Sequence, residues 1–240
     1  MDSTGYTALT RQVGLMREMQ SVAHNIANAS TAGYRREGVI FSEHVAALEG
    51  PGDSLSMANA HVRNIDLSQA PLTQTNGQFD FAIEGEGFFL LETPQGQRLT
   101  RAGSFTPNAD GELVSPDGHR LLDGGGAPVF VPPDAATVAL ASDGTLSADG
   151  QLLAQIGLFL PADPNKLTHV AGTLFDPGGA PDPYLEGTML QGFVEQSNVS
   201  AITEITRMIE VQRAYELGQN FLNQEDERIR SAVRTLSGNS

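Results

Sequence analysis

The two ends of this chain most constrain its fold, because each carries the pattern of an amphipathic helix. In the first 30 residues the apolar side chains recur in steps of three and four, which places them on one helical stripe. The stripe consists of Leu9, Val13, Met16, Met19, Ala23 and Ile26. Polar residues at 2–4 can cap the start of this helix. We expect it to end between Asn28 and Thr31, with Gly33 in a left-handed conformation.

The other end repeats this pattern over a longer stretch. A polar cluster suited to helix capping is formed by Ser197, Asn198 and Ser200. Apolar residues recur around and beyond it at Val199, Ile202, Ile205, Met208, Ile209, Tyr215, Leu222, Ile229, Val233 and Leu236. From Tyr215 to Leu236 the spacing is typical of a coiled coil, although Gln219 and Asp226 interrupt the seam.

Between these ends, residues 70–190 have the character of β structure. Short apolar runs (FDFAI, GFFLLE, APVFVP and QIGLFL) are separated by Gly, Pro, Asn and Asp. Asp-Gly pairs begin at Asp110, Asp117, Asp143 and Asp149, and such pairs favour hairpin turns because both residues tolerate positive φ. The pattern predicts an antiparallel sandwich or a barrel-like domain.

The patterns divide the chain into four segments. Residues 1–34 form an N-terminal helix, 35–69 an extended connector with room for one short strand, 70–190 a central and mainly antiparallel β domain, and 191–240 a C-terminal helix. The predicted fold class is therefore α+β, and we expect the two terminal helices to form an antiparallel, coiled-coil-like pair.

Composition argues against several functions. A formal net charge of -15 disfavours nucleic-acid binding, and the absence of Cys removes disulfides, thiol nucleophiles and Cys-based zinc sites. The sequence contains no EF-hand loop and no H-E-x-x-H zinc motif. Gly85-Glu86-Gly87 begins like a dinucleotide fingerprint but lacks its third glycine. We therefore predict no enzyme activity, no metal, no cofactor and no small-molecule substrate.

Periodicity leaves the purpose of the helical ends open. The two helices can pack on each other within one monomer, or they can pack on partner chains. A structural filament subunit, a secreted β-domain binding module and an acidic hydrolase all remain as hypotheses at this point. The absence of other predicted helices favours partner chains, because a single helix pair hides only one stripe of each member.

Several spaced motifs resemble those of the bacterial flagellar rod and hook proteins. The first is the stretch from Ala23 to Tyr34 (AHNIANASTAGY), in which His24 stands where the family usually has Asn. The second group lies in the middle: GEGFF at 85–89, LTRAGSF at 99–105 and GELV at 111–114. The third is QGFVEQSNV at 191–199, followed by MIEVQRAYE. Their order along the chain makes the resemblance more specific than any single motif.

The resemblance implies a structural subunit of the basal-body rod, most similar to the proximal-rod branch of the family, with the distal-rod branch next. It implies a periplasmic location, export by the flagellar type III apparatus without a cleaved signal peptide, and contact with copies of itself and other rod proteins. The implied subunit interface combines Leu9, Val13, Met16, Met19, Ala23, Ile26, Asn28, Val199, Ile202, Ile205, Ile209, Tyr215, Leu222 and Ile229. Phe41 and Val45 resemble the export motif of early flagellar subunits.

Overall fold

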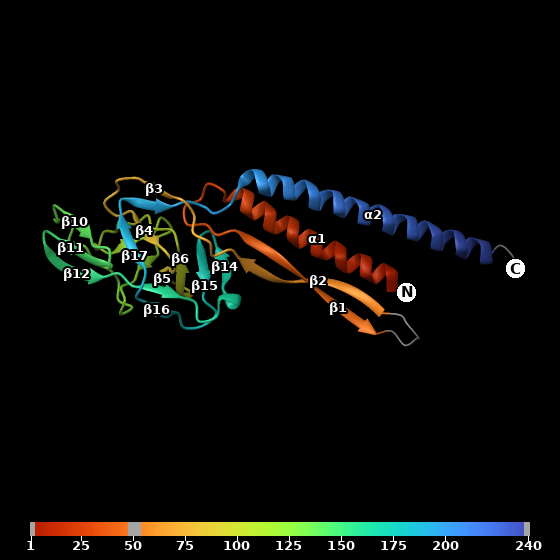
Figure 1. The fold of residues 1–240 in the computed structure, drawn as a ribbon, viewed down its shortest axis with the longest axis horizontal. Helices are drawn as coiled ribbons and strands as arrows, with labels where there is room; N and C mark the ends of the chain where they lie inside the picture. Colours follow the sequence, from red (N-terminus) through yellow and green to blue (C-terminus); the bar gives the residue numbers. More distant parts are fainter. Residues whose placement is uncertain (1–2, 48–53, 238–240) are drawn as a thin grey trace. The chain divides into compact units, whose positions relative to one another are not determined.

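The computed structural model describes residues 3–47 and 54–237, which form two compact units (Figure 1). The first, here called the helical unit, comprises the described parts of residues 1–27, 37–64 and 200–240. The second, here called the β unit, comprises residues 28–36 and 65–199. The predicted α+β class is confirmed. Neither helix within the described ranges is long and apolar enough to cross a membrane.

The helical unit contains two helices and two strands: α1 (Ser3–Ala27), β1 (Glu37–Ala47), β2 (Ser54–Ile65) and α2 (Ala201–Ser237). Helices α1 and α2 lie side by side, and β1 pairs with β2 (Figure 1). The sequence predicted room for one short strand in the connector, whereas β1 and β2 contain 11 and 12 residues. Their small and polar residues give weak periodicity, so pairing with each other decides their conformation.

The helix ends follow local chemistry. Helix α1 stops at Ala27, and Gly33 has the expected positive φ of 76°. Only glycine fits there, because a Cβ at Gly33 would lie 2.2 Å from the backbone nitrogen of Ala102. At the other end, α2 begins at Ala201, and the main-chain oxygen of Ser200 accepts a hydrogen bond from Glu204 at 3.0 Å.

The β unit is built from short strands. The bounds are β3 (Leu72–Gln74), β4 (Phe81–Glu84), β5 (Phe89–Thr93), β6 (Gly96–Thr100), β7 (Thr106–Pro107), β8 (Leu113–Val114), β9 (Arg120–Leu121), β10 (Val138–Leu140), β11 (Thr145–Ala148) and β12 (Gln151–Gln155). They continue with β13 (Leu158–Leu160), the 3-10 helix η1 (Pro164–Lys166), β14 (Thr168–Ala171), β15 (Leu174–Asp176), β16 (Asp182–Tyr184), β17 (Thr188–Gln191) and β18 (Phe193–Glu195).

The largest sheet of the β unit has seven strands in the order β14-β15-β6-β5-β9-β8-β7. Smaller sheets join β10, β11 and β12, and pair β13 with β16, β17 with β4, and β18 with β3. The strand pairings in these sheets are antiparallel, as predicted. Strands β17 and β18 therefore return the chain to β4 and β3, near the point where the unit begins.

Strand β5 is buried on both of its faces, which explains its uninterrupted apolar sequence. Phe89 and Leu91 point into one hydrophobic cluster, whereas Phe88 and Leu90 belong to a second. Phe89 also packs edge-on against Phe105, with ring centroids 5.6 Å apart. The β unit thus has two cores on opposite sides of one central strand.

The Asp-Gly pairs form the predicted turns. Gly111, Gly118, Gly144 and Gly150 all have positive φ, and Asp149 itself has φ of 50°. The carboxylate of Asp149 accepts hydrogen bonds from the main-chain N–H groups of Thr137 at 2.9 Å and Ala136 at 3.2 Å. These bonds lower the pKa of Asp149 below its ordinary value.

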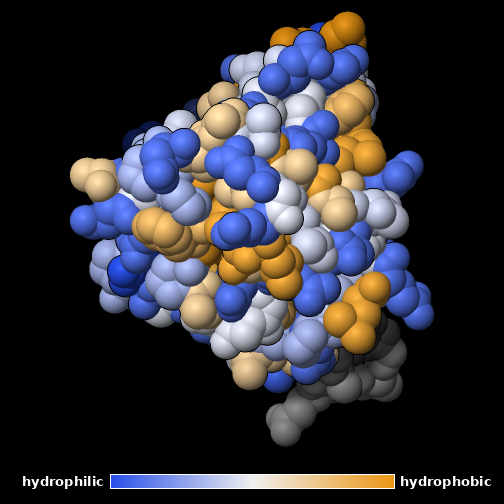
Figure 2. Space-filling model, turned by 90° about the vertical axis from the view of Figure 1, so that its left-hand side faces the viewer, coloured by the Kyte–Doolittle hydropathy of each residue, from blue (hydrophilic) through white to orange (hydrophobic). Residues whose placement is uncertain are grey.

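The face of the β unit seen in Figure 2 is mostly polar. Figure 2 views the molecule from the end where β10, β11 and β12 lie, and it shows apolar side chains in patches separated by polar ones. The large apolar side chains exposed in this unit are Leu67, Phe130, Leu152, Val170 and Leu185. They come from separate loops and strands rather than from one continuous stripe.

Candidate assembly surface

The buried side of α1 is not the apolar stripe that the sequence predicts. Its buried side chains recur in steps of three and four, but most of them are polar: Gln12, Leu15, Glu18, Ser21, Val22 and Asn25. The predicted stripe lies largely on the exposed side. Leu9 is 54% exposed, Met16 50% and Val13 47%. Ala23 is exposed as well, whereas Met19 and Ile26 are partly buried.

Helix α2 divides the predicted apolar positions between two sides. Its less exposed residues follow a seven-residue rhythm and include Glu204, Met208, Val211, Tyr215, Gly218 and Leu222. Ile202, Ile205 and Ile209 fall between these positions, and their side chains are 81%, 50% and 46% exposed. Ile229, further along, is 48% exposed. Tyr215 and Leu222 therefore face inward, and the three isoleucines face outward.

Two of the predicted interface residues lie in the β unit instead. Val199 is buried there with 9% of its surface exposed. Asn28 is partly buried, and its side-chain oxygen accepts a hydrogen bond from the hydroxyl of Thr31 at 3.2 Å. The outward apolar residues of the two helices are thus a smaller set than the sequence predicts, and we call them the outer stripes: Leu9, Val13, Met16, Ile202, Ile205 and Ile209.

Polar contacts join α1 to α2 along their shared seam. The Gln12 amide donates to the main-chain oxygen of Tyr215 at 3.0 Å. Glu18 accepts a hydrogen bond from Nε of Arg207 at 2.7 Å. Burial lowers the pKa of Arg207, but the hydrogen bond and charge of Glu18 outweigh it, and the pKa is raised. The contacts move along α1 and α2 in opposite directions, so the helices run antiparallel.

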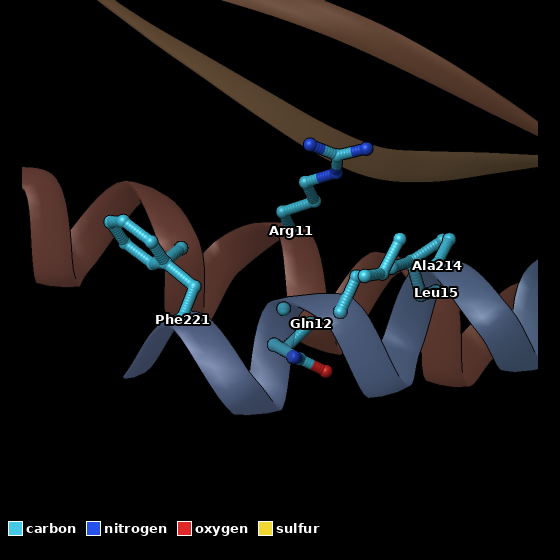
Figure 3. A pocket seen from close by; sticks show the side chains of 8 residues that line it. Arg11, Gln12, Leu15, Ala214 and Phe221 are labelled. Carbon is cyan, nitrogen blue, oxygen red and sulfur yellow. The ribbon is translucent and has the colours of Figure 1, made fainter. Parts of the chain in front are cut away.

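A groove opens along this seam in the helical unit. It has a volume of about 460 Å³ and is lined by Ala8, Arg11, Gln12, Leu15, Ala214, Leu217, Gly218 and Phe221. Figure 3 shows the ring of Phe221 rising from α2 toward α1, while the guanidinium of Arg11 points away from α2. Leu217 and Phe221 are 69% and 41% exposed. Apolar side chains are thus exposed in the groove as well as in the outer stripes.

The β unit contains a buried ion cluster that the sequence analysis did not single out. Glu195 contacts Arg35 at 2.9 Å and Arg101 at 3.0 Å, and none of the three side chains is more than 3% exposed. Arg35 also donates to the main-chain oxygen of Ser68, and Arg101 donates to that of Gly85 at 2.7 Å. Burial lowers the pKa of Arg101 to about 10, although the charge of Glu195 opposes this.

The cluster holds together segments that are far apart in sequence. Arg35 follows the first family motif, Arg101 lies within LTRAGSF, and Glu195 lies within QGFVEQSNV. The sequence gives one hint of the cluster, because each of the three charged residues lies in or next to a family motif. A single sequence does not show that the three side chains meet. The arrangement places the segment after α1 and the strand before α2 on one buried carboxylate of the β unit.

Both helices of the helical unit expose apolar side chains, and exposed apolar surface is typical of the class of structural subunits that assemble with partners. Two family models match the chain. The model described as flagellar basal body rod FlgEFG protein C-terminal matches residues 190–235. The model described as flagellar hook protein FlgE/F/G D1 domain matches residues 82–148.

Full-length relatives agree with these matches. The chain is 36% identical to the flagellar basal-body rod protein FlgF of Mesorhizobium japonicum, with 100% of both chains covered. It is also 36% identical to FlgF of Caulobacter vibrioides, with 98% of each covered. FlgG of Agrobacterium fabrum is 31% identical, over 87% of this chain and 90% of its own. The chain therefore belongs to the flagellar basal-body rod protein family and is a structural subunit of that rod.

The comparisons confirm the resemblance found in the sequence, including the order of its two branches, since these FlgF proteins are more similar than this FlgG. The relatives are named as rod proteins, so the prediction of a structural role and not an enzymatic one is confirmed. The basal body is where the chain acts.

Proposed function

We propose that this subunit joins the rod through its terminal helices, which pack on copies of the same chain and on other rod proteins to form the wall of a hollow, torque-transmitting shaft. The observation that carries the proposal is the exposure of the outer stripes, in which Ile202 is 81% and Leu9 54% exposed. Removing apolar surface from water contributes roughly 25 cal/mol per Å², so packing partners on these stripes stabilises the assembly.

The coiled-coil-like pairing belongs to this proposal. The inward residues of α2 follow the seven-residue rhythm that lets one helix interlock with another. In the assembled rod we expect this seam to hold α1 and α2 together while the outer stripes contact neighbours. The interface would then recruit Leu9, Val13, Met16, Met19, Ala23, Ile26, Ile202, Ile205, Ile209 and Ile229, with Tyr215 and Leu222 supporting it from the seam and Asn28 and Val199 from the β unit.

The division of labour along the chain follows from the same proposal. Residues 1–34 and 191–240 form the assembly region, 35–69 connect it to the rest, and 70–190 form the central β domain. We place the subunit in the periplasmic, proximal part of the rod, because the FlgF relatives are more similar to it than the FlgG relative.

A charge on an outer stripe tests the proposed packing. Met16→Asp and Ile209→Asp each put a carboxylate where a neighbour would bury it, and burying an unpaired charge is strongly unfavourable. We expect either variant to be exported but absent from purified basal bodies. Leu185→Asp is the matched control, because Leu185 is 93% exposed in a loop of the β unit, and this variant should assemble normally. Normal rods from the Met16 and Ile209 variants would contradict the proposal.

Export is a separate part of the proposal, based on the resemblance of Phe41 and Val45 to a flagellar export motif. Both residues fall in β1, but their side chains lie outside those that the structure describes. Phe41→Ala with Val45→Ala should leave the subunit in the cytoplasm, and cell fractionation measures this. Secretion at the wild-type level would remove the motif from the proposal without affecting the packing of the helices.

A further inference from the structure

Three elements of the helical unit meet at buried polar groups that we call the polar junction: Asn25 of α1, Glu37 of β1 and Glu204 of α2. No part of Asn25 is exposed, and Glu204 and Glu37 are 1% and 4% exposed. The Asn25 amide nitrogen donates to the Glu204 carboxylate at 3.0 Å and to the Glu37 main-chain oxygen at 2.8 Å. Its amide oxygen accepts the Glu37 N–H at 2.9 Å. One side chain thus joins both helices to a strand.

Outside the polar junction, the described contacts define the alignment of the two helices less strictly, because the Gln12 amide donates to a main-chain oxygen, which a shifted helix also presents. Among the side chains that the structure describes, the buried apolar ones of α1 and α2 are Leu15, Val22 and Val211. Gly218 provides no side chain, and the ion pair between Glu18 and Arg207 ends on an arginine whose side chain is 47% exposed. Glu18 itself is buried, but water reaches the arginine, so Arg207 exchanges partners at lower cost than a fully buried group would.

The seven-residue rhythm of α2 adds a further ambiguity. A shift of α2 by seven residues again presents an inward residue opposite each inward residue of α1. After such a shift Asn25 would face Val211 instead of Glu204. The amide would lose its carboxylate partner at a buried position, and unmade hydrogen bonds of buried polar groups are costly.

We propose that the polar junction sets the register of α1 against α2. The hydrogen bond between Asn25 and Glu204 is made in one alignment and broken in the shifted ones, so the junction selects a single register at some cost in stability. The register in turn fixes how Met16 of α1 and Ile209 of α2 stand relative to each other on the outside. Register is a property of the single chain, and it stands whether or not the outer stripes join subunits.

Engineered disulfides can measure the register, because the natural sequence contains no Cys. Gln12→Cys with Gly218→Cys reports the observed alignment, since a Cβ placed at Gly218 lies 3.8 Å from Cγ of Gln12. Gln12→Cys with Val211→Cys, or with Glu225→Cys, reports shifts of seven residues in either direction. Intrachain crosslinks are measured by mass spectrometry of the full-length monomer after mild oxidation. We expect the shifted pairs to give at most about one tenth of the 12–218 yield.

The test variant carries both Asn25→Leu and Glu204→Leu. These changes keep a similar side-chain volume and remove both hydrogen-bonding groups, so that neither position is left with an unpaired polar group. We expect the shifted crosslinks to rise at least about fivefold while the helix content from circular dichroism is retained. The matched control is Glu18→Leu with Arg207→Leu, which also removes a polar pair from the seam but should keep the register. Glu204→Gln retains an oxygen that can accept from Asn25, so it should keep the register as well.

Two results would overturn the proposal. In the first, the double leucine variant keeps its helices and its shifted crosslinks stay at the wild-type level. In the second, the variant loses its helix content and crosslinks in no register, while Glu204→Gln behaves like the wild type. The junction would then be needed for stability of the pair and not for its alignment. Assembly of rods enters neither result.

Discussion

The two units of this protein bury opposite kinds of residue. In the β unit, large apolar side chains such as Phe81, Phe89 and Phe175 are fully buried, and Glu195 is buried between two arginines. In the helical unit, isoleucine and leucine side chains remain in water, while Asn25 and Glu204 are buried. The β unit therefore buries its large apolar side chains as an independent domain does. The helical unit leaves many of its apolar side chains exposed, so their burial does not stabilise this unit in the single chain.

The contrast indicates where each unit obtains its stability. The β unit gains from its own cores, so its free energy of unfolding should not depend on partners. The outer stripes of the helical unit are exposed to water. The free energy of unfolding of this unit should therefore rise when a partner binds α1 and α2 and covers the stripes. Variants that remove equivalent side chains from the two units can break or sharpen this comparison.

The largest expected effect is in the ion cluster of the β unit. Glu195→Leu would leave Arg35 and Arg101 buried together without their shared carboxylate, and breaking a buried pair in this way costs about 3–5 kcal/mol. Urea unfolding of the full chain measures the loss in free energy of unfolding, with hydrogen exchange in peptides of the β unit as the readout. A decrease below about 1 kcal/mol would mean that water reaches these arginines and that the β unit is less closed than its exposed areas imply.

A slightly smaller effect is expected from truncating a core side chain. Phe89→Ala removes a fully buried ring and should lower the free energy of unfolding of the β unit by about 3–4 kcal/mol. Ile202→Ala is the matched truncation in the helical unit, where the side chain is 81% exposed, and in the monomer it should change stability by less than about 0.5 kcal/mol. Equal losses in the two variants would contradict the contrast between the units.

The smallest expected effect is a pH dependence at Asp149 of the β unit. Hydrogen bonds from the main-chain N–H groups of Thr137 and Ala136 lower the pKa of Asp149 in the folded protein. A lowered folded-state pKa contributes stability above the unfolded value near pH 4, and that stability is lost as the pH falls through the folded value. Asp149→Asn should therefore be less stable than the wild type at pH 7, with the difference shrinking at pH 3. Urea midpoints at both pH values measure it.

Much of the fold could be predicted from the sequence because it depends on local chemistry. The positive φ of Gly33 and the turns at the Asp-Gly pairs follow from which residues tolerate such a backbone. The buried run around Phe89 is apolar enough to identify a strand covered on both sides. By contrast, the sequence predicted only one short strand where the structure has the long strands β1 and β2. Their small and polar residues show little periodicity, and the two strands pair with each other.

The candidate surface was predicted less completely than the fold. The sequence identifies apolar stripes, but it does not say which stripe is inside. It placed Tyr215 and Ile209 on one surface, whereas the structure separates them, with Tyr215 inward and Ile209 outward. It also missed Glu195 and Asn25 as buried centres, because burying a polar residue depends on hydrogen-bond partners that arrive from distant segments.

By itself, the sequence determined the α+β class, the helical character of both ends, the turns and the family, since these depend on local propensity, periodicity and ordered motifs. The tertiary structure alone decided that the seam between α1 and α2 is largely polar and that Leu9, Val13 and Met16 stay exposed. The physical reason is that a helix has several faces, and which one is buried depends on the specific hydrogen bonds that its neighbours can complete.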